Sequence, residues 1–268
     1  MLLLTSKLLK TKMYIIILGF IALASLLVWY FLHHDHGRKL PVGSLWVAFG
    51  FGVLGMILAG FLELKLFPAK FWTSPLSVSL STRFLFFLGV GALEESVKFI
   101  PLAIFIYKKP YFKEHTDGVI YFAICGLTFG LGENILYTLS FGTKVGITRL
   151  ILTPFLHAAA TSILGYYLVS MKINHSFRNK FILACVAIPL MHGVYDFGLY
   201  SGIAQLIVLS LMITLLLTLG LFLYFMEAND LDKAIAARLL AAAPKFCGNC
   251  GRVNADHTLF CEYCGRKL

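Results

Sequence analysis

The chain has 268 residues, of which 59% are hydrophobic and only 13% charged, and its mean hydropathy is +0.84. A soluble globular protein carries about a quarter charged residues, so this composition excludes a soluble domain and indicates a polytopic membrane protein. Lys and Arg number 23 against 13 Asp and Glu, and because much of this basic excess lies in loops and the C-terminal tail, we interpret it as topology and expect no nucleic-acid partner.

Seven apolar runs are long enough to cross a bilayer as helices. They cover approximately residues 14–32, 43–66, 84–107, 117–139, 150–170, 181–200 and 203–226. The first run follows three lysines, as a signal peptide would, but no small-residue cleavage site follows it, so we count it as a span. The predicted fold is an all-α polytopic membrane protein with about seven transmembrane helices and a small C-terminal zinc ribbon.

The distribution of Lys and Arg predicts the orientation in the membrane. The N-terminal side, called side A, holds eight, among them Arg83 and Arg149. The opposite side, side B, also holds eight in its loops, and the tail adds six more. The positive-inside rule therefore predicts an integral cell-membrane protein with a cytoplasmic C-terminus and a non-cytoplasmic N-terminus.

The chain divides into three predicted regions: a transmembrane domain over 1–226 with a motif core over 84–200, a juxtamembrane helix and linker over 227–244, and a zinc ribbon over 245–268. The ribbon contains two CxxC pairs, each followed by glycine, formed by Cys247, Cys250, Cys261 and Cys264. Four thiolates at this spacing are typical of a structural tetrahedral zinc. The rival interpretation, two disulfides, requires an oxidising compartment and conflicts with a cytoplasmic tail. We expect the ribbon to be a docking or stability module.

Four consecutive spans carry polar residues near their centres. They are Glu94, Glu95 and Lys98 in the third, Glu133 and Asn134 in the fourth, His157 in the fifth, and His192 and Asp196 in the sixth. Ionisable groups at such depth are costly and usually functional. Measured from side A at 1.5 Å per residue, Glu94 lies about 15 Å deep, Glu133 about 9 Å, His157 about 10 Å and His192 about 12 Å. The agreement in depth permits one common site.

Residue types and spacing then suggest the chemistry of that site. Glu94 and Lys98 share a helix face at i,i+4, as do His192 and Asp196. Glu133, His157 and His192 together offer three ligands for a catalytic zinc, which needs three protein ligands and one open position. Glu94 or Glu95 would then act as general base toward water.

Each of these residues also has a structural interpretation. A lone intramembrane His is more often a hydrogen bonder between helices, and Asn134 and Thr161 suit helix packing. We expect Glu63, near a span end, to be interfacial, and the HHDH sequence at 33–36 to be solvated. Because four consecutive spans carry polar residues at one depth, however, we favour a functional site.

These residues resemble the PrsW family of intramembrane metalloproteases, which is related to the CAAX-processing and bacteriocin-processing membrane endopeptidases. The resemblance rests on Glu94-Glu95-x-x-Lys98, Phe129-x-x-x-Glu133, His157 in an HAxxT setting, and His192-x-x-x-Asp196. Lys98 and Glu133 favour the PrsW branch over the CAAX branch.

The resemblance implies an intramembrane endopeptidase that cleaves membrane-associated proteins, and PrsW relatives are associated with site-1 regulatory proteolysis. Glu94 and Glu95 would activate water, Glu133, His157 and His192 would bind the metal or the oxyanion, and Asp196 would support them. A glutamate-only mechanism without metal stays open. Two alternatives are a CAAX-type prenyl-protein endopeptidase and, from another class, a proton- or cation-coupled transporter that uses the buried carboxylates.

Overall fold

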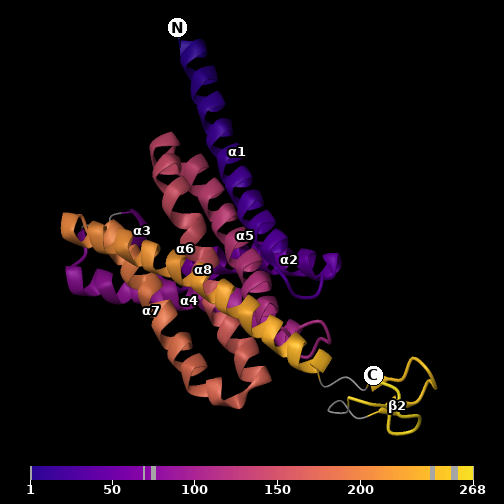
Figure 1. Cartoon of the computed structure of the whole chain (residues 1–268). Coiled ribbons are helices and arrows are strands. Elements are labelled where there is room, and N and C mark those ends of the chain that lie inside the picture. The colour runs from indigo at the N-terminus through magenta and orange to yellow at the C-terminus, as the bar shows by residue number, and fades with distance from the viewer. Residues whose placement is uncertain (1, 69, 74–76, 242–244, 255–258, 268) are drawn as a thin grey trace.

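The computed structural model describes residues 2–68, 70–73, 77–241, 245–254 and 259–267 (Figure 1). Within these ranges the chain is mostly helical. The helices are α1 (Leu2–His34), α2 (Val42–Leu66), α3 (Lys70–Thr73), α4 (Leu80–Ile106), α5 (His115–Phe141), α6 (Thr143–Ile173), η2 (His175–Phe177), α7 (Arg178–Tyr200) and α8 (Ala204–Ala241). Two short strands, β1 (Lys245–Phe246) and β2 (Val253–Asn254), pair antiparallel near the C-terminus.

Six helices of the described chain are long and apolar enough to cross a membrane, namely those over Thr11–His34, Val42–Leu66, His115–Phe141, Leu152–Ile173, His175–Tyr200 and Ala204–Leu239. They confirm an all-α polytopic membrane protein. The predicted third span corresponds to α4, which has 27 residues but carries Arg83, Glu94, Glu95 and Lys98. The count of seven spans therefore stays a prediction.

The last span and the predicted juxtamembrane helix form one continuous helix, α8, of 38 residues. No proline or glycine interrupts the segment after Met226, and its alanines favour helix, so the backbone has no reason to break there. Residues 242–244 of the predicted linker lie outside the described residues. In Figure 1, α8 leads directly from the helical bundle toward the C-terminal strands.

Helices α5 and α6 pack most closely, through small residues. A Cβ at Gly118 would overlap the backbone of Gly165, and one at Gly126 would overlap the backbone of His157. Membrane helices lack a hydrophobic drive to associate in lipid, so such close backbone approach provides the van der Waals contact that holds them. The same contact fixes His157 of α6 against the α5 helix.

Hydrogen bonds join the chain segments at each end of the bundle. At the side B end they connect four pairs: His36 N to Asn229, Arg38 to the Tyr111 carbonyl, Lys172 to the Tyr107 carbonyl, and His115 to Asp232. At the side A end, Arg83 donates to the carbonyls of Tyr200 and Ser201, each at 3.2 Å. Helix α4 therefore has one end at each side of the bundle.

Two arginines counted as side A loop residues lie inside helices. Arg83 and Arg149 belong to α4 and α6, and each is only 8% exposed. Both helices begin several residues before the apolar runs. Ser79 caps α4 by accepting a hydrogen bond from the backbone N–H of Thr82, and α6 starts at Thr143. Both arginines are thus structural groups of the bundle.

Candidate active site

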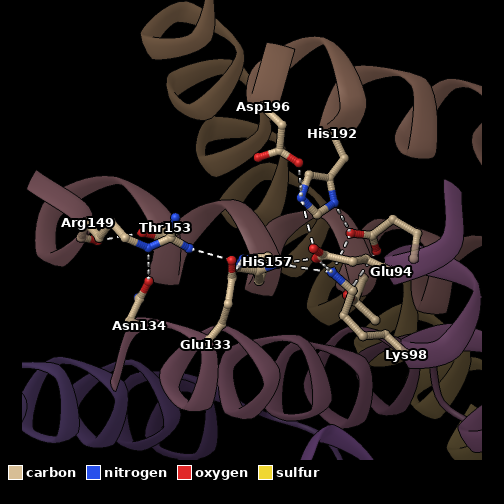
Figure 2. A network of polar contacts seen from close by, with 11 residues as sticks. Glu94, Lys98, Glu133, Asn134, Arg149, Thr153, His157, His192 and Asp196 are labelled. Atoms are coloured by element: carbon tan, nitrogen blue, oxygen red, sulfur yellow. Dashed lines mark hydrogen bonds and ion pairs between the residues drawn. The ribbon is translucent and has the colours of Figure 1, made fainter. Parts of the chain in front are cut away.

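Four helices bring the predicted polar residues into one contact network (Figure 2). Glu94, Glu95 and Lys98 come from α4, Glu133 from α5, His157 from α6, and His192 and Asp196 from α7. Glu94 is 6% exposed, and Glu95, Lys98, His157 and His192 are 1% exposed or less. Residues that the depth estimate placed at one level are therefore in direct contact.

Lys98 lies at the centre of the network. Its Nζ is 2.7 Å from Glu95 Oε1, 3.0 Å from His157 Nδ1 and 3.5 Å from Glu94 Oε2. It also lies 4.2 Å from the centre of the Phe129 ring, a cation–π contact. A fully buried ammonium needs such partners, since its transfer from water is otherwise prohibitive. Lys98 thereby fixes both the Glu95 carboxylate and the His157 ring.

Glu95 is fully engaged by its neighbours. Besides Lys98, it accepts hydrogen bonds from His192 Nδ1 at 2.7 Å and from the Thr161 hydroxyl at 3.2 Å. Because a carboxylate only accepts, His192 Nδ1 must donate, which leaves Nε2 directed elsewhere. That Nε2 faces two carboxylates, Glu94 Oε2 at 3.7 Å and Asp196 Oδ2 at 3.5 Å. Glu95 thus orients His192, and Thr161, expected to serve packing alone, supports Glu95.

Glu133 is held by an arginine that the sequence interpretation assigned to a loop. Arg149 Nη2 is 2.7 Å from Glu133 Oε1, and its Nε donates to Asn134 Oδ1 at 2.8 Å. Glu133 Oε2 in turn lies 2.9 Å from His157 Nε2. The Lys98 ammonium donates to Nδ1 of that ring, so Nε2 donates to Glu133. A chain of contacts therefore runs from Arg149 through Glu133 and His157 to Lys98.

The structure groups three metal-ligating side chains. One ligand atom each from Glu94, His157 and His192 lies within 4.8 Å of the others. The predicted set had Glu133 in place of Glu94, and Glu133 instead pairs with Arg149. Two imidazoles and one carboxylate are a donor set typical of catalytic zinc.

A cavity of about 140 Å³ adjoins this network. Its lining includes four carboxyl groups, those of Glu63, Glu94, Glu133 and Asp196. Glu63, expected to be interfacial, therefore lies beside the site, and α2 is a fifth helix that contributes to it. The cavity has room for water, and its carboxyl groups suit proton transfer.

The tail cysteines form a second group. All four lie within 4.8 Å of one another, with 3.5 Å between the Cys247 and Cys264 sulfurs and 3.6 Å between those of Cys250 and Cys261. None is disulfide-bonded. Each CxxC loop closes in the same way, by a 2.8 Å hydrogen bond from the following glycine N–H to the first cysteine carbonyl. Gly251 and Gly265 have φ of +69° and +72°, which glycine adopts without strain.

Backbone N–H groups stabilise the thiolates of this group. Hydrogen bonds from Cys250 and Asn249 lower the pKa of Cys247. At Cys261, desolvation opposes the effect, but hydrogen bonds from Tyr263 and Cys264 prevail and lower its pKa to about 6. The thiolate is the form that binds metal.

Comparison with known proteins identifies the family. The profile described as PrsW family intramembrane metalloprotease matches residues 40–225. The protein named Protease PrsW from Bacillus subtilis (strain 168) is 31% identical over 233 residues, which cover 85% of this chain and 99% of that relative. The chain belongs to the PrsW family. A second Protease PrsW, from Geobacillus kaustophilus (strain HTA426), is 31% identical over 186 residues, covering 66% of this chain and 80% of that relative.

A third relative named Protease PrsW, from Clostridioides difficile (strain 630), is 32% identical over 138 residues, or 49% of this chain and 58% of its own length. No solved structure matches the chain. Membership of the PrsW family confirms that the protein is a membrane-embedded protease, an intramembrane endopeptidase. The CAAX-type and transporter alternatives gain no support from these relatives.

Proposed function

We propose that the protein hydrolyses a peptide bond of a membrane-associated substrate at the cavity beside Glu94, Glu133 and Asp196. The observation that carries this proposal is the convergence of Glu94, His157 and His192, with ligand atoms within 4.8 Å, next to a cavity large enough for water. The donor set of a hydrolytic metal and a place for its reactants are therefore adjacent.

The residues present fit a divalent metal, which we take to be zinc. Glu94, His157 and His192 would hold it, since His192 Nε2 faces the carboxylate of Glu94 and makes only long contacts. Nδ1 of His157 would become free to bind the metal if Lys98 gave up its contact with that nitrogen and kept its ion pair with Glu95, at 2.7 Å. A bound divalent cation would supply Lewis-acid activation of water and of the scissile carbonyl.

The remaining residues position these groups and move protons. Glu95 holds His192 through Nδ1, and Glu133, clamped by Arg149, holds His157 through Nε2. Carboxylates commonly orient ligand imidazoles in this way. Asp196 lines the cavity and lies 3.5 Å from His192 Nε2, so it is placed to accept a proton from the attacking water. The sequence predicted Glu94 or Glu95 as the general base, and we assign that role to Asp196 instead.

Metal content and cleavage test the proposal together. We would purify the full chain in nanodiscs and measure zinc by mass spectrometry, expecting two per chain. Cys247→Ser with Cys264→Ser should remove one zinc and leave cleavage of a reconstituted single-span reporter intact. His192→Ala should remove the other zinc and abolish cleavage. His175→Ala, an exposed histidine outside the bundle core, is the matched control.

The outcome that overturns the metal assignment is His192→Ala protein that keeps both zincs. If that protein also cleaves the reporter, the site assignment itself is wrong. A wild-type chain that cleaves with only the ribbon zinc bound would support the glutamate-only mechanism, with Glu94 rather than a metal activating water.

The proposal includes seven spans with the C-terminus in the cytoplasm. Helix α4 contacts side A through Arg83 and side B through the Tyr107 carbonyl, which supports a full crossing. With the buried Arg83 and Arg149 set aside, side A keeps six Lys and Arg near its helix ends against eight on side B, so the count without the tail also favours side B as cytoplasmic. The cut bond would then lie in or just above the non-cytoplasmic leaflet. A C-terminal fluorescent-protein fusion that fails to fluoresce would refute this orientation.

The Cys247, Cys250, Cys261 and Cys264 group is proposed as a zinc ribbon. Its support is the matching pair of glycine-closed CxxC loops and the two-stranded pairing of Lys245 with Asn254. So small a unit has almost no core, and its metal would supply the folding free energy. We assign it a docking or stability role separate from hydrolysis.

A further inference from the structure

An apolar groove lies on the outside of the bundle, away from the active-site cavity. Its walls are α1 and α2, and its floor is α5, against which both of these helices pack (Figure 1). The groove has a volume of about 730 Å³. Its apolar lining includes Ala24, Val28 and Leu32 of α1 and Ile124, Leu127 and Leu131 of α5. Residues spaced by three or four positions form one face of a helix, so α1 and α5 each turn a whole face toward the groove.

The groove reaches from the side B end of α1 to about the middle of the membrane. His33 lines one end of it, and Ile21, twelve residues earlier in α1, lines the other. At 1.5 Å per residue this length is about 18 Å. The hydrocarbon of one leaflet is about 15 Å deep, half of a bilayer core of about 30 Å. The groove therefore has the depth of one lipid acyl chain that enters from side B.

Hydrogen-bond donors gather at the side B mouth of the groove. The His33 ring stacks on Trp29 with 5.0 Å between the ring centres, and Trp46 lies on the opposite wall. Trp29 is 58% exposed and Trp46 is 66% exposed. Tryptophan is typical of the membrane interface, where its indole N–H meets lipid headgroups, and an imidazole donates at least one hydrogen bond in either tautomer. The mouth is thus suited to the oxygens of a phosphate.

The loop between α1 and α2 adds positive charge to this mouth. His33 and Val42 both line the groove, so the loop that joins them closes its side B end. In this loop Arg38 donates to a backbone carbonyl of the α4–α5 connection at 2.8 Å, and Asp35 accepts from a backbone N–H of the loop itself. Lys39 is exposed and has no ion pair among the described residues, so its charge is available to an anion.

We propose that the groove binds one acyl chain of an anionic glycerophospholipid of the side B leaflet, with the phosphate at His33 and Lys39. The volume of the groove lies within the range of about 300–1,000 Å³ that is typical of small-ligand sites. A substrate helix is a poorer fit, because a helix about 10 Å wide and 18 Å long occupies about 1,400 Å³, roughly twice the volume of the groove. The inference is independent of the proposed hydrolysis, since the groove shares no residue with the polar network of the active site.

Quenching of tryptophan fluorescence by brominated lipid tests this inference. The full-length Trp72→Phe protein in phosphatidylcholine vesicles emits only from Trp29 and Trp46. Phosphatidylglycerol or phosphatidylcholine with brominated acyl chains then replaces a growing fraction of the host lipid. A lipid held in the groove quenches at low mole fraction and saturates, whereas lipid that only surrounds the protein quenches in proportion to its mole fraction. We expect saturation, with half-quenching at a mole fraction about fivefold lower for phosphatidylglycerol, the gain that one lysine near the surface provides.

Two variants separate the parts of the proposed site. Ser25→Phe places a ring in the groove and should make quenching proportional, while Ala22→Phe, at an exposed α1 position outside the groove, is the matched control and should keep saturation. Lys39→Gln, in an exposed loop position, should keep saturation but remove the preference for phosphatidylglycerol.

Three results would overturn the inference. Proportional quenching by both lipids in the Trp72→Phe protein would mean that the groove holds only exchangeable bulk lipid. Equal half-quenching by the two lipids would show that the mouth does not recognise an anionic headgroup. Fluorescence that recovers when an unbrominated, uncleaved single-span reporter is added would assign the groove to a substrate helix instead.

Discussion

The pair of Arg149 and Glu133 gives the sharpest test of the network, because removing one partner leaves the other buried. The side chains are 9% and 18% exposed, and Nη2 lies 2.7 Å from Oε1. Arg149→Met also removes the 2.8 Å hydrogen bond to Asn134 and the stacking 4.0 Å over the Tyr137 ring. Loss of one member of a buried ion pair costs about 3–5 kcal/mol, and we expect Arg149→Met to lower the free energy of unfolding by that amount.

A double-mutant cycle isolates the pair from general disruption. Glu133→Gln, Arg149→Met and the double variant would be unfolded by sodium dodecyl sulfate in mixed micelles and followed by circular dichroism. Because the second substitution removes a charge that the first has left unpaired, the double variant should be more stable than additivity predicts by about 2 kcal/mol. Lys144→Met, which removes an exposed charge one turn earlier in α6, should have little effect.

Additive losses would refute the reasoning, since they would mean that Arg149 and Glu133 do not interact. If Lys144→Met lowered the free energy of unfolding as much as Arg149→Met, the loss would reflect a general effect of net charge and not the Arg149–Glu133 pair. In either case Glu133 would not be clamped, and its proposed role in orienting His157 would lose its basis.

Three further outcomes are expected. Asp232→Ala should lower the free energy of unfolding by about 2–4 kcal/mol, because Asp232 accepts hydrogen bonds from the backbone N–H groups of His115 and Thr116 and from the His115 ring. Unfolding in mixed micelles measures this loss, and an unchanged midpoint would contradict the prediction. Gly91→Ala should reduce both stability, by about 1–3 kcal/mol, and cleavage, because its Cβ would overlap the backbone next to His192; full activity would exclude this tight α4–α7 contact. The lowered pKa of Cys261, about 6, means that its thiolate persists above that pH and is lost below it, so zinc bound by the ribbon should fall as the pH drops through about 6. Zinc retained in His192→Ala protein well below that pH would contradict this.

Six of the predicted spans and the grouping of the central polar residues could be predicted from the sequence because both depend on local signals. Apolar length marks a span, and a charged residue such as Glu94 in the middle of one is conspicuous. Arg149 was counted in a loop, and Glu63 was not connected with the site, because each lies near the end of an apolar run, where hydropathy alone does not separate a loop from a helix end. The register of α2 carried a usable signal, since Glu63 falls on the helix face of Gly55 and Ala59.

The group of possible metal ligands contains Glu94 where the sequence predicted Glu133, and this difference has another cause. Depth along the membrane normal is readable from sequence, but the rotation of each helix about its axis depends on packing partners. Close contacts such as that of Gly126 with His157 set this rotation. They place Glu133 toward Arg149 and Glu94 toward His192. Helical spacing within one span cannot show which of two carboxylates on different spans faces a given histidine.

The charges of the site bear on the metal proposed for it. Five carboxyl groups, those of Glu63, Glu94, Glu95, Glu133 and Asp196, gather there with two cationic side chains, Lys98 and Arg149. Fully ionised, these described residues would leave three uncompensated negative charges inside the membrane, where unpaired charge is most costly. A divalent metal at Glu94, His157 and His192 would offset two of them. Zinc binding should therefore release protons that the carboxyl groups hold in its absence, measurable in weakly buffered solution, and a His192→Ala protein should lack this release.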